Sequence, residues 1–202
     1  SPMGKFRPFS VGFYICMPAG VPEAERRNGK MEKLRFMLIG CGRISKNHIA
    51  AAAANQDSCE LVAVCDPVVE LAEKKADDMQ AAAGYRPQVY ADYRKALEEL
   101  PVDCCAIATE SGYHAEIALN CIAHGKHVLI EKPMALSTAD AEKILAEAEK
   151  KGVTVGVCHQ NRFNAPIQQL HRALEDGRFG KLVNGTARIL WNRTMPYYQQ
   201  AP

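Results

Sequence analysis

The residues of this sequence best suited to binding or catalysis come directly after apolar stretches. The first candidates along the chain are two glycines. Gly40-Cys41-Gly42 follows the apolar run Leu34–Ile39 and precedes a segment compatible with a helix. Gly40 permits a tight turn, and Gly42 lets the backbone approach a pyrophosphate, which the free N–H groups of a helix N-terminus attract. Ser45 stands where a third glycine is usual. The stretch predicts a dinucleotide-binding turn.

Asp66 is the second candidate, at the end of the next apolar run. A carboxylate about 20 residues beyond such a turn accepts hydrogen bonds from the ribose hydroxyls of an adenosine. It would repel a 2′-phosphate, which favours NAD over NADP as the cofactor. The alternative is that Asp66 only forms a turn before Pro67.

Lys132 is the third candidate, within the Glu131-Lys132-Pro133 segment that follows the apolar run His127–Ile130. A partly buried lysine beside a nicotinamide could hydrogen-bond a substrate hydroxyl and stabilise the alkoxide that develops as hydride leaves. The alternative is a surface Glu–Lys pair at the end of a strand.

Other polar side chains have weaker claims. Thr109 ends an apolar run and could touch the cofactor, and Gln160 could contact the substrate. Arg162 could bind an anionic group of the substrate or form an interdomain salt bridge. Lone histidines such as His48 and His114 are more often packing or capping residues than catalysts. No nucleophile elbow, P-loop or spaced metal-ligand cluster is recognised, so no metal is expected.

These candidates need a scaffold that gathers strand ends at one edge. Apolar runs predict strands, which alternate with segments of helical period. We expect strands at residues 34–39, 60–65, 88–90, 102–108, 127–130 and 153–158, and helices at residues 44–56, 68–83, 93–100, 113–124 and 138–151. This order predicts an α/β protein with a Rossmann-type, doubly wound parallel sheet over residues 31–158.

The two ends of the chain differ from this pattern. Residues 1–30 are rich in proline and glycine and are expected to be a disordered leader or the product of an upstream start. Residues 166–176 predict a helix, and residues 181–193 alternate as a strand does, without a neighbouring strand in sequence. We expect residues 159–202 to begin an α+β substrate and oligomerisation domain that is incomplete here.

Composition narrows the function classes. The 202 residues are 48% hydrophobic and 24% charged with a net charge of +2, and basic and acidic residues are interleaved. This excludes a strongly basic nucleic-acid surface. No apolar run approaches the ~20 residues that span a bilayer, so no membrane partner is expected. Eight cysteines without Cys-x-x-Cys spacing favour reduced thiols in a cytoplasmic protein.

Several motifs occur in a characteristic order: Gly40-Cys41-Gly42-Arg43-Ile44, His48, Asp66, His114, Glu131-Lys132-Pro133 and Gln160-Asn161-Arg162-Phe163. In this order the chain resembles the glucose–fructose oxidoreductase/inositol dehydrogenase (Gfo/Idh/MocA) family over residues 33–202. The wider sequence resembles members that oxidise a UDP-linked N-acetylglucosaminuronic acid with NAD.

The resemblance implies roles for particular residues. Lys132 would be the catalytic or substrate-orienting lysine, held in place by Glu131, and the Lys132–Pro133 peptide would be cis. The residues near NAD would be Gly40, Gly42, Arg43, Ile44, Asp66, Thr109, His114, Glu131, Lys132 and Pro133, and those near the substrate Lys132, Gln160 and Arg162. Glu110-Ser111 replaces the family's usual Pro-Asn, which puts contacts from that loop in question.

The resemblance also implies an Asp and a His in a second domain, and no such pair follows Trp191. We therefore expect these 202 residues to bind NAD without efficient turnover, as part of a homodimeric or homotetrameric dehydrogenase of sugars or nucleotide sugars. The alternatives are a non-catalytic dinucleotide-binding redox sensor and a scaffold in which Lys132 is only structural.

Overall fold

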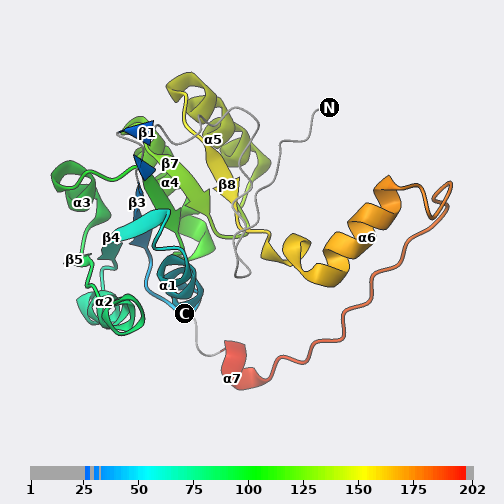
Figure 1. Cartoon of the computed structure of the whole chain (residues 1–202), viewed down its shortest axis with the longest axis horizontal. Helices are drawn as coiled ribbons and strands as arrows, with labels where there is room; N and C mark the ends of the chain where they lie inside the picture. Colours follow the sequence, from blue (N-terminus) through cyan, green and yellow to red (C-terminus); the bar gives the residue numbers. More distant parts are fainter. Residues whose placement is uncertain (1–25, 28–29, 32, 199–202) are drawn as a thin grey trace. The chain divides into compact units, whose positions relative to one another are not determined.

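The computed structural model describes residues 26–27, 30–31 and 33–198, and its centre is a six-stranded parallel sheet (Figure 1). The strand order is β5-β4-β3-β6-β7-β8, and every neighbouring pair is parallel. The strands are β3 (Leu34–Ile39), β4 (Cys59–Cys65), β5 (Gln88–Tyr90), β6 (Cys104–Ile107), β7 (His127–Ile130) and β8 (Val155–Val157). The order reverses between β3 and β6, as in doubly wound folds.

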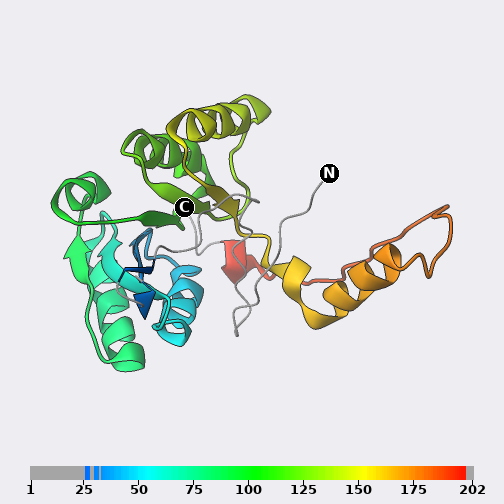
Figure 2. The same ribbon diagram turned by 45° about the horizontal axis from the view of Figure 1, so that its top comes forward.

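Helices cover both faces of this sheet. They are α1 (Ser45–Ala54), α2 (Val69–Ala83), α3 (Tyr93–Glu99), α4 (His114–Ala123) and α5 (Thr138–Lys151), with 3-10 turns η1 (Ser111–Tyr113) and η2 (Gln160–Phe163). In Figures 1 and 2, α1 and α2 lie on the opposite side of the sheet from α4 and α5. The predicted Rossmann-type α/β fold is confirmed.

The two faces of the sheet have separate cores because successive side chains of a strand point to opposite faces. Met37 and Ile39 pack with the core that includes α4 and α5, whereas Leu38 packs with α1 and α2. The strands are therefore apolar on both faces, which explains their continuous apolar runs.

Predicted helix ends are confirmed at several positions. The Asp92 side chain accepts from the Arg94 N–H and the Ser137 side chain from the Asp140 N–H. Gly84 and Gly152 end α2 and α5 in the left-handed conformation. Side-chain caps and left-handed glycines satisfy the unpaired backbone groups of helix ends, so they define these boundaries locally.

Contacts divide the chain into two compact units, one ending at Asn164 and the other beginning at Ala165. The second unit contains α6 (Ala165–Glu175), the helix predicted there, and the short α7 (Met195–Tyr198). The strand predicted at residues 181–193 is wrong for this structure, which has no strand there. A strand needs partner hydrogen bonds, and the described part of the chain offers this segment none.

The described part of the expected leader also differs from the prediction. β1 (Arg26–Arg27) pairs with β2 (Lys30–Met31) in antiparallel register. The Asn-Gly sequence at 28–29 is a strong hairpin signal that could have predicted this pairing. The rest of the expected leader lies outside the described residues. Among the described helices, none has the length and apolarity to cross a membrane.

Candidate functional site

The carboxyl ends of four parallel strands bring most of the predicted site residues to one edge of the sheet. β3 leads into the glycine turn, β4 into Asp66, β6 into Thr109 and β7 into Glu131-Lys132-Pro133. In doubly wound sheets, ligands bind outside these strand ends and near the point where the strand order reverses. Here that point lies between β3 and β6, so the glycine turn and Thr109 flank it.

The two glycines of the turn have different structural requirements. Gly40 has φ +95°, and a Cβ there would lie 2.6 Å from the Ala108 carbonyl carbon. Gly42 is exposed, and a Cβ there would meet nothing within 4 Å. Gly40 is thus required by packing between β3 and β6, while the space beside Gly42 is open to a ligand.

The first turn of α1 suits an anion. It contains no acidic side chain, and Ile44 at its N-cap provides no side-chain hydrogen bond to its N–H groups. Ser45, in place of the third glycine, is fully buried, and its hydroxyl donates to the Gly42 carbonyl. A helix N-terminus without an internal anion offers its N–H groups and positive dipole end to a phosphate.

Asp66 is held across the turn by the backbone. Its Oδ2 accepts from the Cys41 N–H at 2.8 Å and its Oδ1 from the Val68 N–H at 2.9 Å. An ionised carboxylate has about four acceptor positions, so two stay available for ribose hydroxyls. With the open Gly42 and the uncapped helix, this half-buried carboxylate fits a dinucleotide.

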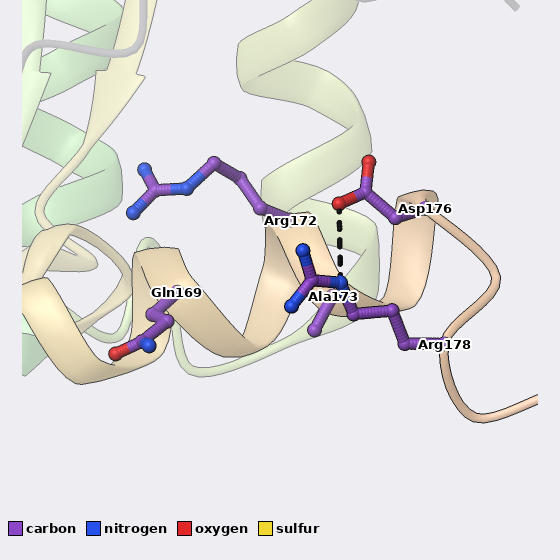
Figure 3. A pocket seen from close by; sticks show the side chains of 5 residues that line it. All are labelled: Gln169, Arg172, Ala173, Asp176 and Arg178. Carbon is purple, nitrogen blue, oxygen red and sulfur yellow. Dashed lines mark ion pairs between the residues drawn. The ribbon is translucent and has the colours of Figure 1, made fainter.

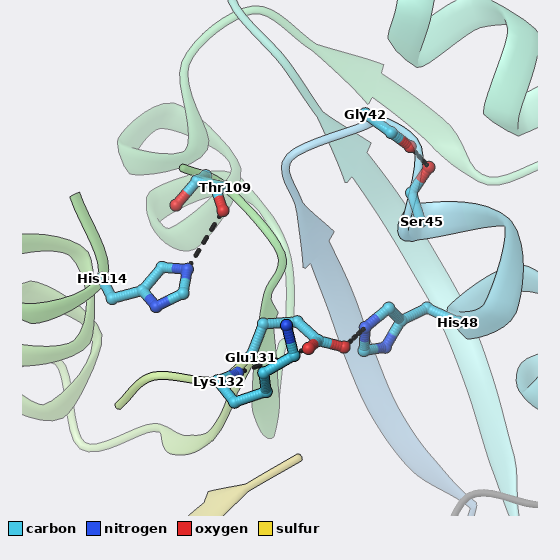
Figure 4. A network of polar contacts seen from close by, with 7 residues as sticks. All are labelled: Gly42, Ser45, His48, Thr109, His114, Glu131 and Lys132. Carbon is cyan, nitrogen blue, oxygen red and sulfur yellow. Dashed lines mark hydrogen bonds and ion pairs between the residues drawn. The ribbon is translucent and has the colours of Figure 1, made fainter. Parts of the chain in front are cut away.

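Glu131 faces the interior instead. Its Oε1 lies 3.1 Å from Nε2 of His48 in α1, and both side chains are buried (Figure 4). Its Oε2 accepts from the Lys132 backbone N–H at 3.3 Å. Burial raises the pKa of the Glu131 carboxyl. The hydrogen bond and charge of His48, together with hydrogen bonds from the Lys132 N–H and Cys158, lower this pKa by more, so the net shift is downward.

Lys132 is exposed, so the expected partial burial is wrong for this structure. Its side chain follows β7 at the rim, while the neighbouring Glu131 turns inward. The Lys132–Pro133 peptide is cis, as the resemblance implied. Lys132 lines a hollow of about 170 Å³ whose other lining residues are Cys158, His159, Gln160, Asn161 and Arg162. The three predicted substrate residues therefore share one hollow.

His114 lies beneath the rim and not on it. It is fully buried, and its Nδ1 lies 2.7 Å from the Pro133 carbonyl oxygen. Its Nε2 lies 3.0 Å from the Thr109 carbonyl oxygen (Figure 4). Its ring thus ties the end of β6 to the segment after β7. We assign His114 to holding this edge together, with Thr109 half-buried above it.

Sequence reasoning missed the cluster beneath Lys132. The ligand-type atoms of His48, Glu131 and Cys158 lie within 4.8 Å of one another, all buried, although no local spacing links them. Such a set could in principle bind zinc. Each group already has a hydrogen-bond partner in the cluster. A carboxylate directly after a buried strand was the available signal, because a buried charge requires a partner.

A second hollow, of about 390 Å³, lies along α6 in the other unit (Figure 3). Its lining residues are Gln169, Arg172, Ala173, Asp176 and Arg178. Asp176 lies 3.5 Å from the Arg178 Nε and neutralises part of its charge. Except for half-buried Ala173, these residues are exposed, and we assign no chemistry to them.

Comparison with known proteins agrees with this geometry. Residues 34–159 match the sequence model of GFO_IDH_MocA, described as an oxidoreductase family with an NAD-binding Rossmann fold. The chain belongs to this family. The predicted resemblance and the NAD cofactor of its fold are thereby confirmed.

Two solved structures and one curated relative illustrate the range of the family. The WlbA dehydrogenase from Bordetella pertussis, in complex with NADH and UDP-GlcNAcA, is 37% identical with a TM-score of 0.75, covering 84% of this chain and 50% of its own. The Chromobacterium violaceum WlbA structure, with the same two ligands, is 33% identical with a TM-score of 0.70, covering 84% and 47%. The inositol 2-dehydrogenase of Salmonella typhimurium is 26% identical, covering 82% and 48%. The chain spans about half the length of these relatives.

Proposed function

We propose that this chain is the NAD-binding part of a dehydrogenase that oxidises a secondary alcohol of a sugar or nucleotide sugar. The observation that carries the proposal is the shared hollow of Lys132, Gln160 and Arg162 at the same sheet edge as the glycine turn and Asp66. The WlbA structures with NADH and UDP-GlcNAcA support a nucleotide sugar as substrate.

The cofactor would be held by the turn and its surroundings. Gly42, Arg43 and Ile44 would meet the pyrophosphate, and Asp66 the adenosine ribose, which favours NAD over NADP. Gly40 permits the turn, and Thr109, Glu131 and Pro133 border the nicotinamide side. Bound NAD supplies a hydride acceptor.

Lys132 would act on the substrate. An exposed ammonium can donate a hydrogen bond to a substrate hydroxyl and stabilise negative charge as it develops on that oxygen. Gln160 is half-buried in the same hollow and can orient the sugar. Arg162 is exposed there and suits an anionic group of the substrate, such as a carboxylate or diphosphate.

Residues 159–202 would belong to a substrate and oligomerisation domain, and the protein would act as a homodimer or homotetramer. We also infer a cytoplasmic location. The seven cysteines in the described residues are all free thiols, as is usual in a reducing compartment.

The experiment is an NADH titration followed by a turnover assay with UDP-N-acetylglucosaminuronic acid and inositol, in the full product of the gene. We expect Lys132→Ala to lower kcat at least about 100-fold while the Kd for NADH changes little. Lys143→Ala, an exposed lysine of α5, is the matched control and should change neither. NADH binding without turnover of any sugar would instead favour the redox-sensor alternative.

A further inference from the structure

One group of buried side chains adjoins the proposed site but is given no step in its chemistry. His48 comes from α1, Glu131 follows β7 and Cys158 follows β8. Their exposed fractions are 4%, 5% and 4%. Because a buried carboxylate is costly unless it is paired, such an arrangement needs a structural or functional reason.

We propose that His48 is a positioning residue for Lys132 and acts through the Glu131 carboxylate. The proposal rests on the proposed function, in which Lys132 contacts the substrate. His48 holds Oε1, at 3.1 Å, and the carboxylate then presents Oε2 to the Lys132 backbone N–H, at 3.3 Å. The Lys132 side chain is exposed, and this contact fixes the backbone from which that side chain extends.

The direction of the hydrogen bond follows from the chemistry of the pair. An ionised carboxylate is an acceptor only, so the His48 Nε2 must carry the hydrogen. Around Glu131 the facing groups are His48, the Lys132 N–H and the Cys158 thiol. Burial, and next the Glu131 charge, raise the pKa of the Cys158 thiol, so this thiol is neutral and donates to the carboxylate.

The position of His48 connects two parts of the site. α1 begins directly after the glycine turn, and His48 lies in its first helical turn. The Glu131-Lys132-Pro133 segment follows β7, which is separated from β3 in the sheet by β6. The imidazole therefore links the helix that meets the cofactor pyrophosphate to the lysine that meets the substrate. The residue after Lys132 is also held, because Nδ1 of His114 lies 2.7 Å from the Pro133 carbonyl oxygen.

The first test measures position without relying on turnover. Amide hydrogen exchange is followed by NMR in the wild-type chain and in the His48→Leu and His48→Gln variants. The matched control is His124→Leu, because His124 is an exposed histidine of the same chain. Exchange of the Lys132 amide should accelerate at least about tenfold in His48→Leu, because the Glu131 carboxylate that accepts from this amide loses its hydrogen bond from His48. His48→Gln retains an N–H donor and should remain within about threefold of wild type.

The second test uses the full product of the gene. His48→Leu should lower kcat about 100-fold and leave the Kd for NADH within about threefold, because a displacement near 1 Å is enough for such a loss. His48→Gln should recover most of kcat, and His124→Leu should match wild type. If the wild-type protein turns over no sugar, the proposed function fails, while the exchange result still reports on the Lys132 backbone.

Three results would overturn the proposal. The first is an unchanged Lys132 amide in a folded His48→Leu variant. The second is equal loss of kcat in His48→Leu and His48→Gln, which would indicate general damage. The third is a rise in melting temperature with added Zn²⁺ that Cys158→Ser abolishes, since this would assign the cluster to metal binding.

Discussion

At the scale of single residues, two carboxylates at the sheet edge have opposite surroundings. Asp66 is half-buried, and its hydrogen bonds within the described part of the chain come from the backbone N–H groups of Cys41 and Val68, so acceptor positions stay available to a ligand. Glu131 is buried and paired with His48, so its charge is satisfied internally. The same functional group therefore keeps acceptor positions available at one location and is internally paired at the other.

This difference predicts the effect of Asp66→Asn. Its side chain loses the charge that favours ribose hydroxyls and leaves one backbone N–H without a good acceptor. We expect the Kd for NADH, measured by fluorescence titration, to rise about tenfold, because hydrogen bonds to a charged group are worth ~1.5–3 kcal/mol. The preference for NADH over NADPH should also weaken.

Asp103→Asn is the matched control for that experiment. Asp103 also accepts from a backbone N–H, that of Arg35 at 2.9 Å, and from the Arg35 guanidinium. It precedes β6, at the amino edge of the sheet, and not at the ligand edge. The variant should unfold more easily and bind NADH as wild type does. Equal loss of NADH affinity in both variants would remove Asp66 from the site.

At the scale of elements, local signals predict most of the Rossmann unit. Asp92 and Ser137 are side-chain caps, and Gly84 and Gly152 are left-handed ends, so the helices they border could be predicted from neighbouring residues alone. Strand ends depend on partners instead. Among the described strands β8 lies at the edge of the sheet and pairs with β7 alone, and it covers three residues where the apolar run predicted six.

The glycine turn gives the sharpest test at this scale. Gly40→Ala should destabilise the fold by roughly 2–4 kcal/mol, because the new Cβ would meet the Ala108 backbone and φ is positive. Gly42→Ala should leave the melting temperature almost unchanged but raise the Kd for NADH at least about tenfold, because its Cβ would occupy the ligand's space. The two variants thus separate folding from binding.

Gly84→Ala is the control for strain without a clash. Gly84 has φ +81°, but a Cβ at this position would meet nothing within 4 Å, so the variant should cost only about 1 kcal/mol. Thermal and denaturant unfolding measure the three variants. A Gly40→Ala variant as stable as Gly84→Ala would contradict the tight approach of β3 and β6.

At the scale of the whole molecule, the sequence could not predict contacts between residues that are distant along the chain. His48 and Glu131 are 83 positions apart, and neither has a local signal for the other. The residues at the rim were predictable because strand ends of a parallel sheet converge by topology. Lys132 was expected to be partly buried, but it is exposed beside a hollow that is also lined by Cys158 and His159, which follow β8, and by residues of η2.

The division into two units predicts that the first is sufficient for NADH binding. The two apolar cores, with the side chains packed against them, end at Val155 in sequence, and α6 contains no buried residue. A chain ending at Asn164 should therefore keep its melting temperature, and its Kd for NADH should stay within about twofold. It would also lose the exposed apolar side chains of α6, Ile167, Leu170 and Leu174, and aggregate less.

A chain ending at Lys151 is the matched control for that prediction. It lacks β8, which leaves β7 as an unpaired sheet edge, and it lacks Cys158, which hydrogen-bonds Glu131. We expect a lower melting temperature and weaker NADH binding in this shorter chain alone. If the chain ending at Asn164 loses NADH binding as well, residues after 164 contribute to the cofactor site, and the first unit is not sufficient for it.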